Sequence, residues 1–130
     1  MRRISLLLIA GALLAAPAAA ETFDRTVKAN ARTAIGGFFG YEVETCYPSN
    51  IPDAKVRHAP ANGQIAIVPH DQVLGTNSRC PGRKVRGLAY IYTPKKGFKG
   101  LDEVAIDVPW SSTDSGADTL WTYTYRIRVE

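Results

Sequence analysis

Apolar and polar residues alternate most regularly near the end of the chain. From Trp121 to Glu130, aromatic and aliphatic residues take every second position, and Thr, Arg and Glu fill the positions between them. The segment before it has the same pattern, with Val104, Ile106 and Val108 as its apolar set. A period of two places the apolar side chains on one face of a strand and the polar ones on the other. The pattern therefore predicts two half-buried strands.

Five shorter segments continue the strand pattern upstream, separated by clusters of Gly, Pro, Asn and Ser. They are Phe23 to Ala29, Tyr41 to Cys46, Ala54 to His58, Gln64 to Val68, and Lys84 to Tyr92. Helical periodicity is confined to the first residues of the chain. Short strands with frequent turn residues are typical of a β-sandwich, so the sequence predicts an all-β, single Greek-key sandwich of about seven strands. An eight-stranded barrel is the competing architecture.

Three connections follow from the same reading. The cysteine-bearing stretch Pro69 to Arg83 is expected to be a loop, and the glycine-rich segment Ile35 to Tyr41 leads into the second predicted strand. The polar stretch Pro109 to Ala117 joins the last two strands, either as a hairpin or by crossing between sheets.

Two motifs carry a resemblance to a known family. PANGQIAIV at positions 60–68 and YIYTPKKGFKGLDEVAIDV at positions 90–108 together resemble the signature of bacterial immunoglobulin-like and cadherin-like domains. The resemblance implies an immunoglobulin-like sandwich, a fold used mostly for binding and scaffolding. Asn62 and Gly63 suit a tight hairpin turn, and Phe98 lies between two glycines, where it can plug the end of the core. In the family, the carboxylate at the position of Asp102 commonly caps backbone amides of the nearby turn.

Residues 1–20 have the form of a secretory signal peptide. Met1 to Arg3 is a short basic start, Ile4 to Ala16 is apolar, and small residues end at Ala20. We expect cleavage after Ala20 and a mature domain at 21–130 that is periplasmic or secreted by a bacterium. The apolar run is too short to span a membrane. The twin-arginine route is an alternative mode of export.

The two cysteines are expected to pair. Cys46 and Cys80 face an oxidising compartment after export, where an even number of cysteines usually indicates a disulfide.

The net charge and its distribution along the chain indicate which classes of partner to expect. The formal net charge of +4 falls to +2 when Arg2 and Arg3 leave with the signal, which is too small to indicate nucleic acid. The interval from Gln72 to Leu101 nevertheless contains no acidic residue, and it carries a candidate anion-binding set: Arg79, Arg83, Lys84, Arg86, Lys95, Lys96 and Lys99. Solvated turns and a protected sheet edge give the same pattern.

Adjacent aromatic residues offer a second candidate contact. Phe38 and Phe39 cannot easily both point inward, so one exposed ring is a candidate binding residue, unless both fold under as loop plugs.

The histidines, aspartates and serines form no recognisable catalytic or metal-binding motif. His58 and His70 lack metal-ligand spacing, and the aspartates lack the closely spaced runs of calcium-binding repeats. No nucleophile signature surrounds a serine. We therefore expect no metal, no cofactor and no catalytic residue.

The sequence favours a non-catalytic binding module. Its expected partner is another envelope or extracellular protein, or an anionic glycan or lipid surface. The alternatives are a small hydrolase or metal-dependent enzyme on a sandwich scaffold, and a structural assembly subunit whose last strand pairs with a neighbour's edge.

Overall fold

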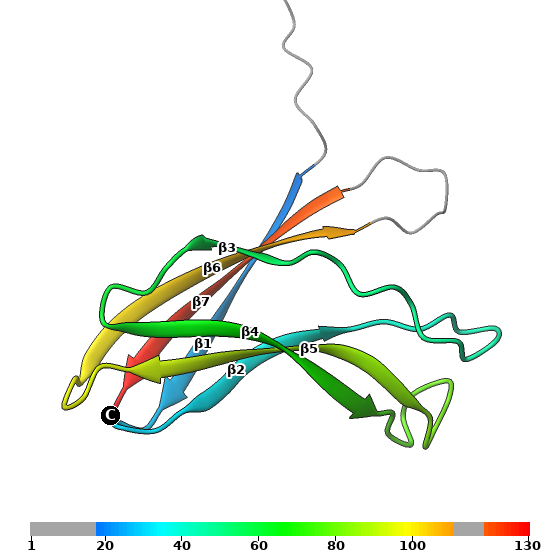
Figure 1. The fold of residues 1–130 in the computed structure, drawn as a ribbon, viewed down its shortest axis with the longest axis horizontal. Coiled ribbons are helices and arrows are strands. Elements are labelled where there is room, and N and C mark those ends of the chain that lie inside the picture. Colours follow the sequence, from blue (N-terminus) through cyan, green and yellow to red (C-terminus); the bar gives the residue numbers. More distant parts are fainter. Residues whose placement is uncertain (1–17, 111–118) are drawn as a thin grey trace, which may run out of the picture.

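The computed structural model describes residues 18–110 and 119–130, which form seven strands and no helix (Figure 1). The strands are β1 (Ala18–Val27), β2 (Thr33–Phe39), β3 (Lys55–His58), β4 (Gly63–Val73), β5 (Lys84–Pro94), β6 (Gly100–Trp110) and β7 (Thr119–Val129). They form a four-stranded sheet in the order β1-β7-β6-β3 and a three-stranded sheet in the order β2-β5-β4. The two sheets pack face to face, which confirms the predicted sandwich.

The last two strands are partners in one sheet. β6 pairs with β7 antiparallel from Gly100 opposite Val129 to Trp110 opposite Thr119. This settles the open choice in favour of the hairpin. Pro109 and Trp110 of the predicted connecting loop belong to β6, and the rest of that loop, at 111–117, lies outside the described residues. β7 pairs in parallel with β1 on its other side, so it is an interior strand.

The second predicted strand was placed wrongly. Tyr41 to Cys46 forms a turn, and the strand is β2, which includes Ile35 to Phe39 of the glycine-rich segment that was not predicted as a strand. The glycines belong there for packing reasons. A Cβ on Gly36 would lie 2.6 Å from Cζ of Tyr125, and one on Gly37 would meet the carbonyl oxygen of Leu88. β2 therefore needs small residues where it crosses an aromatic ring and its neighbouring strand.

The expected loop from Pro69 to Arg83 is also shorter than predicted. β4 continues to Val73, pairing with β5 along its whole length, so the loop begins at Leu74. Pro69 is compatible with this strand because β4 is an edge strand of its sheet.

The turn at Asn62 and Gly63 is not a hairpin turn. It joins β3 to β4, which belong to different sheets, and neither residue has a positive φ. The glycine is required for close approach, since a Cβ on Gly63 would lie 2.6 Å from the carbonyl oxygen of Thr93 and 2.7 Å from the ring of Tyr92.

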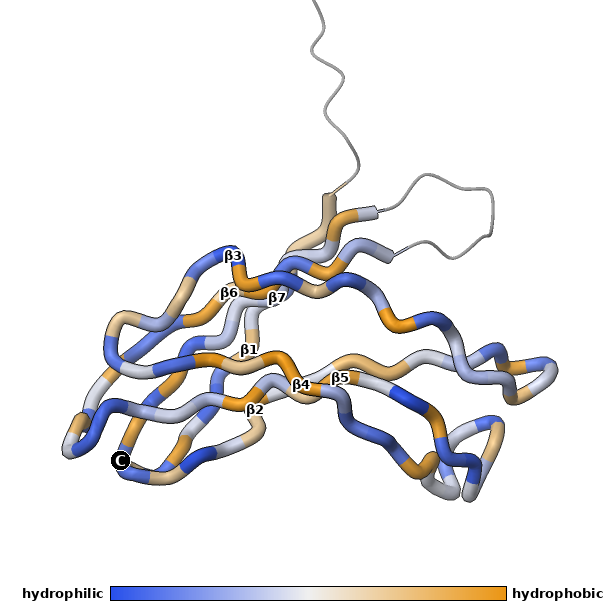
Figure 2. Tube along the Cα trace, in the orientation of Figure 1, coloured by the Kyte–Doolittle hydropathy of each residue, from blue (hydrophilic) through white to orange (hydrophobic). Residues whose placement is uncertain are grey.

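The core lies between the sheets and is rich in aromatic residues. Its buried members are Val27, Ile35, Tyr90, Tyr92, Val104, Ile106, Val108, Tyr125, Ile127 and Val129. Figure 2 shows the corresponding alternation of hydrophobic and hydrophilic positions along the strands. Phe98 is partly buried against this core, which confirms its predicted place at the end of the sandwich.

The predicted cleavage point falls within the first strand. β1 begins at Ala18, and Ala18 to Ala20 pair with Leu120 to Thr122 of β7. The rest of the predicted signal, at 1–17, lies outside the described residues. Within the described ranges, no helix is long and apolar enough to cross a membrane.

Candidate functional site

Cys46 and Cys80 form the predicted disulfide, with a Cα–Cα distance of 5.8 Å. The bond joins the β2–β3 connection to the β4–β5 loop. Leu74, Cys80 and Val85 form a small buried cluster there, separate from the main core, and Tyr41 packs against it. Both connections are therefore fixed to one end of the three-stranded sheet.

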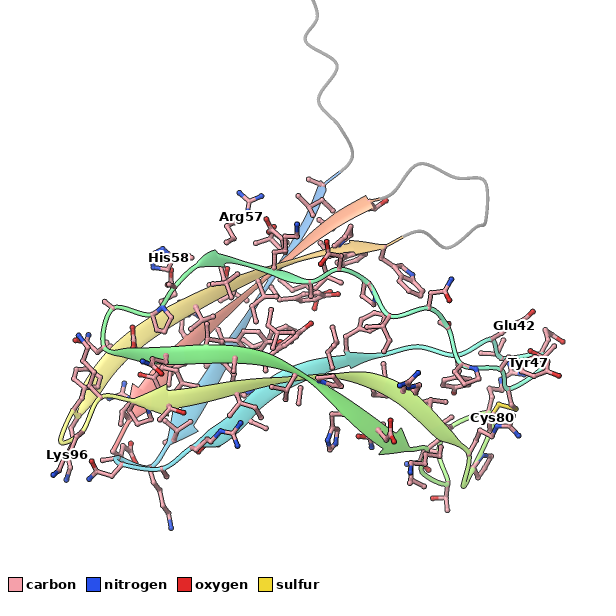
Figure 3. The ribbon with its side chains drawn as sticks, in the orientation of Figure 1. Glu42, Tyr47, Arg57, His58, Cys80 and Lys96 are labelled. Carbon is pink, nitrogen blue, oxygen red and sulfur yellow. A yellow bond between two sulfur atoms is a disulfide. The ribbon has the colours of Figure 1, made fainter. Side chains whose placement is uncertain are left out.

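The segment at 40–49, which we call the disulfide lobe, has its own backbone hydrogen bonds. Tyr41 forms a β-bridge with Pro48. The amide of Glu42 donates to the carbonyl of Tyr47 at 2.8 Å, and the amide of Cys46 donates to the carbonyl of Glu42 at 2.8 Å. Cys46 adopts a positive φ of 61°, which closes this tight turn. Figure 3 shows Glu42, Tyr47 and Cys80 together at one extremity of the molecule.

Exposed apolar side chains gather around the disulfide lobe. In the described residues, seven large apolar side chains are well exposed, and five of them come from the end of β2, the β2–β3 connection or the end of β4. These five are Phe39, Val43, Tyr47, Ile51 and Val73. Tyr47 is 64% exposed and Val43 is 52% exposed. One of the two adjacent phenylalanines is exposed, as the sequence suggested. Phe38 packs on Trp110 with ring centroids 5.1 Å apart, whereas Phe39 is 50% exposed.

The predicted basic set does not form one surface. Eight residues of β5 lie between Arg86 and Lys95 and separate the two halves by about 30 Å of extended strand. Arg79, Arg83, Lys84 and Arg86 lie at the end that carries the disulfide, and Lys95, Lys96 and Lys99 lie in the turn after β5.

The cations beside the disulfide share their end of the sandwich with acidic residues. The Nζ of Lys84 lies 3.3 Å from a carboxylate oxygen of Asp71, and Arg86 is opposite the same Asp71 in the β4–β5 register. The disulfide also holds Glu42 and Glu44 at this end. The interval from Gln72 to Leu101 contains no acidic residue, but folding brings carboxylates from other segments to the same surface.

The other end of the sandwich gathers more cations than the sequence indicated. The amide of Gly97, in the β5–β6 turn, donates a 2.8 Å hydrogen bond to Oδ1 of Asn30, in the β1–β2 connection. The two turns therefore touch, and they bring five exposed cations together: Lys28, Arg32, Lys95, Lys96 and Lys99. We call this group the basic end. Lys28 and Arg32 lie far upstream of the predicted set. Their place in this group could be predicted only by knowing that the β1–β2 connection contacts the β5–β6 turn.

An ion-pair network lies on the outer face of the four-stranded sheet. Asp107 accepts hydrogen bonds from Nε of Arg57 at 2.7 Å and from the hydroxyl of Thr122 at 2.7 Å. Partial burial alone would raise the pKa of Asp107, but the hydrogen bonds from Arg57 and Thr122 and the charge of Arg57 outweigh it, so the pKa is lowered. These groups satisfy one another and tie β3, β6 and β7 together.

The same outer face has an open depression of about 690 Å³. Its lining includes His58, Asp24, Glu103, Arg126 and Leu101. Asp24 is paired with Arg126 at 3.0 Å. His58 points outward near Arg57 in Figure 3, and His70 lies on the separate edge strand β4, so the two histidines do not meet.

Metal-ligating side chains do not cluster in the described part of the chain: no group of three or more His, Cys, Asp or Glu residues is placed to hold an ion. Comparisons of the chain with protein families, with curated proteins and with solved structures find no match.

Proposed function

We propose that this chain is an exported, non-catalytic binding module that contacts a partner protein through the disulfide lobe and the adjoining β4–β5 loop. The observation that carries the proposal is the concentration of exposed apolar side chains, Tyr47 and Val43 among them, on a segment held by a disulfide and by its own hydrogen bonds. Exposed apolar side chains that are grouped on one part of a domain often mark an interaction site.

The composition of this end suits a protein interface. Tyr and Arg are enriched among residues that dominate binding energy, and here Tyr47 and Phe39 share one end of the sandwich with Arg79 and Arg83. The lobe is ordered before it binds, because the Cys46–Cys80 bond fixes it to the sheet. A preformed contact surface loses less conformational entropy on association.

We also propose that the chain is related to the immunoglobulin-like domains that its motifs resemble. The strand order β1-β7-β6-β3 against β2-β5-β4 supports this, and the strands β2, β4 and β6 end at the same end of the sandwich, with Phe38 of β2 packed on Trp110 of β6 (Figure 1). Immunoglobulin-like modules commonly use such loops for recognition.

Site-specific photo-crosslinking in the source cell tests the protein-binding proposal. A photoreactive amino acid is placed at Tyr47 or at Val43, and at Thr93 as a matched exposed position near the opposite end of the sandwich. We expect one crosslinked product of discrete mass from the first two positions and none from Thr93. A Tyr47→Ala substitution should also reduce the yield from position 43. Equal yields from all three positions, or none from the lobe, would contradict the proposal.

The outer-face depression gives the enzymatic alternative a definite location, since it brings His58 and Glu103 into one lining. A hydrolytic activity of the purified chain that is lost in His58→Ala and retained in Tyr47→Ala would favour that alternative. The assembly alternative needs a different strand from the one expected, because β7 already has a partner on each side.

A further inference from the structure

The basic end has few nearby counterions. The four ion pairs found in the described residues involve Lys55, Arg57, Lys84 and Arg126, none of which belongs to it. Two acidic residues lie at this end. Glu130 is exposed, and its backbone amide donates to the carbonyl of Val27 at 2.9 Å. Asp102 is only 8% exposed, and its carboxylate accepts hydrogen bonds from the amides of Ala61 and Asn62, whose carbonyls hold Lys95. Five exposed cations beside one exposed and one buried carboxylate leave a positive surface even though the whole chain is only modestly basic.

The turn that carries three of these lysines is held firmly. The amide of Lys95 donates to the carbonyl of Asn62 at 2.9 Å, and its Nζ donates to the carbonyl of Ala61 at 3.1 Å. The amide of Phe98 closes the turn on the carbonyl of Lys95 at 3.0 Å, and Gly97 has the positive φ of 77° that this reversal requires. The array of charges is therefore set by the fold.

An exposed apolar side chain follows the lysine turn, two residues after Lys99. Leu101 follows the β5–β6 turn and is 69% exposed, the highest value among the large apolar residues of the described chain. Arg128 is its neighbour across the β6–β7 pair. Leu101 also lines the outer-face depression, where Arg126 and Arg128 alternate with Asp24 and Glu103. Covering this exposed side chain would add apolar burial to a contact made by the basic end.

We propose that the basic end docks the domain, end on, onto a membrane surface of anionic lipid, with the lysines on the phosphates and Leu101 at the depth of the headgroups. Two features favour a bilayer over a polyanionic chain. The cations project from touching turns at the extremity of the molecule, where Figure 3 shows Lys96, and do not line a groove that would follow a strand of polymer. Four of the five are lysines, hydrated point charges that suit a diffuse charged surface better than fixed bidentate recognition.

This inference goes beyond the proposed protein contact and uses the opposite end of the sandwich. A chain bound in this way would present the disulfide lobe away from the membrane, about the length of β5 from the lipid. Each interface can fail without the other, because the residues that carry them are separate.

Sedimentation with lipid vesicles tests the docking. The mature chain is mixed with vesicles of phosphatidylglycerol and phosphatidylcholine in equal parts, and with vesicles of phosphatidylcholine alone. Each cation near an anionic surface contributes about fivefold to binding, so Lys96→Gln with Lys99→Gln should weaken binding by about 25-fold. The matched control is Arg79→Gln with Arg83→Gln, which removes the same charge from the other end and should change binding by less than about twofold.

Two further arms separate lipid from other polyanions. Leu101→Ser should weaken binding to the anionic vesicles several-fold and leave binding to soluble heparin unchanged. Added salt should weaken vesicle binding as it screens the lysines. The proposal is overturned by equal losses in the two double variants, by no binding to the anionic vesicles at low salt, or by tighter binding to heparin than to the vesicles.

Discussion

The hydroxyl of Tyr92 donates a 2.7 Å hydrogen bond to Oδ2 of Asp102, and this bond joins the two sheets through the interior. Asp102 is only 8% exposed, and it also accepts hydrogen bonds from the amides of Ala61, Asn62 and Glu103 at 3.0, 3.1 and 2.9 Å. A buried carboxylate is tolerated when it is this well satisfied. The resemblance implied a capping carboxylate, but it caps the β3–β4 turn and its own strand, not the turn that precedes it.

Tyr92→Phe should destabilise the fold by about 1.5 to 3 kcal/mol, the usual effect of losing a hydrogen bond to a buried charged group. The substitution removes one donor and leaves the ring in place, so packing is preserved. Urea unfolding at neutral pH measures the change. Tyr47→Phe is the control, because Tyr47 is largely exposed, and it should have an effect within about 0.5 kcal/mol. Equal stabilities for the two variants would refute the assigned role of this bond.

Tyr90→Phe, in contrast to Tyr92→Phe, should not destabilise the fold. The hydroxyl of Tyr90 is buried and, within the described part of the chain, has no hydrogen-bond partner. Leaving a buried polar group unsatisfied costs about 1 to 3 kcal/mol, so its removal should leave stability unchanged or raise it by about 1 kcal/mol. The same unfolding experiment checks this. A loss comparable to that of Tyr92→Phe would show that the hydroxyl of Tyr90 is satisfied in solution.

The strands that the sequence predicted well are those with a strict period of two. The last two strands show the alternation over many residues, and their inner and outer faces follow from it directly. β2 was missed because its two adjacent glycines and two adjacent phenylalanines hide the period. Those glycines are explained by Tyr125 and Leu88, which are distant in sequence, so no local reading could have assigned them to a strand.

The candidate binding surfaces also depend on contacts between segments that are distant in sequence. The disulfide needed only the count of cysteines and the expected compartment. The basic set was predicted as one interval of sequence, but charge on a surface depends on which segments the fold brings together. β5 divides the set, Asp71 pairs with Lys84, and the contact of Asn30 with Gly97 adds upstream cations to the lysine turn.

Gly36→Ala should destabilise the protein by about 1 to 3 kcal/mol. The added methyl group would lie 2.6 Å from Cζ and 2.8 Å from Cε1 of Tyr125, and the buried ring has little room to move. Gly75→Ala is the matched control, since nothing lies within 4 Å of a Cβ at that position. Thermal unfolding of the two variants compares them. If both melt like the parent chain, the close packing of β2 on Tyr125 is wrong.

The fold should lose stability in alkaline solution. Burial raises the pKa of Tyr125 from 10.0 to about 12, and it also raises the pKa values of Tyr90 and Tyr92. The neutral phenol is favoured in the folded state, so the free energy of unfolding is unaffected well below pH 10 and falls as the pH rises above it, where the unfolded chain ionises first. Each buried tyrosine contributes at most about 1.4 kcal/mol per pH unit.

Urea unfolding across this alkaline range, with tyrosinate absorbance as a second signal, measures the effect. The quantity compared is the fall in the free energy of unfolding per pH unit. Tyr125→Phe should make this fall less steep, by about the contribution of one buried tyrosine, and Tyr47→Phe at an exposed position should not change it. A slope that is the same in both variants would contradict the role of Tyr125.

Loss of the disulfide should weaken the fold and the lobe to different degrees. Cys46 and Cys80 are 34 positions apart, and closing a loop of that length stabilises a folded chain by about 3 to 4 kcal/mol in the chain-entropy model. Ser replaces both cysteines in the variant, so no free thiol remains to form new bonds. We expect a lower urea midpoint with the sandwich still formed, because the main core contains neither cysteine. Hydrogen exchange should rise most at the amides of Glu42 and Cys46, whose bonds close the lobe. Uniform acceleration across β5 to β7, with no excess in the lobe, would mean that the bond supports the whole sandwich and does not specifically order the proposed contact surface.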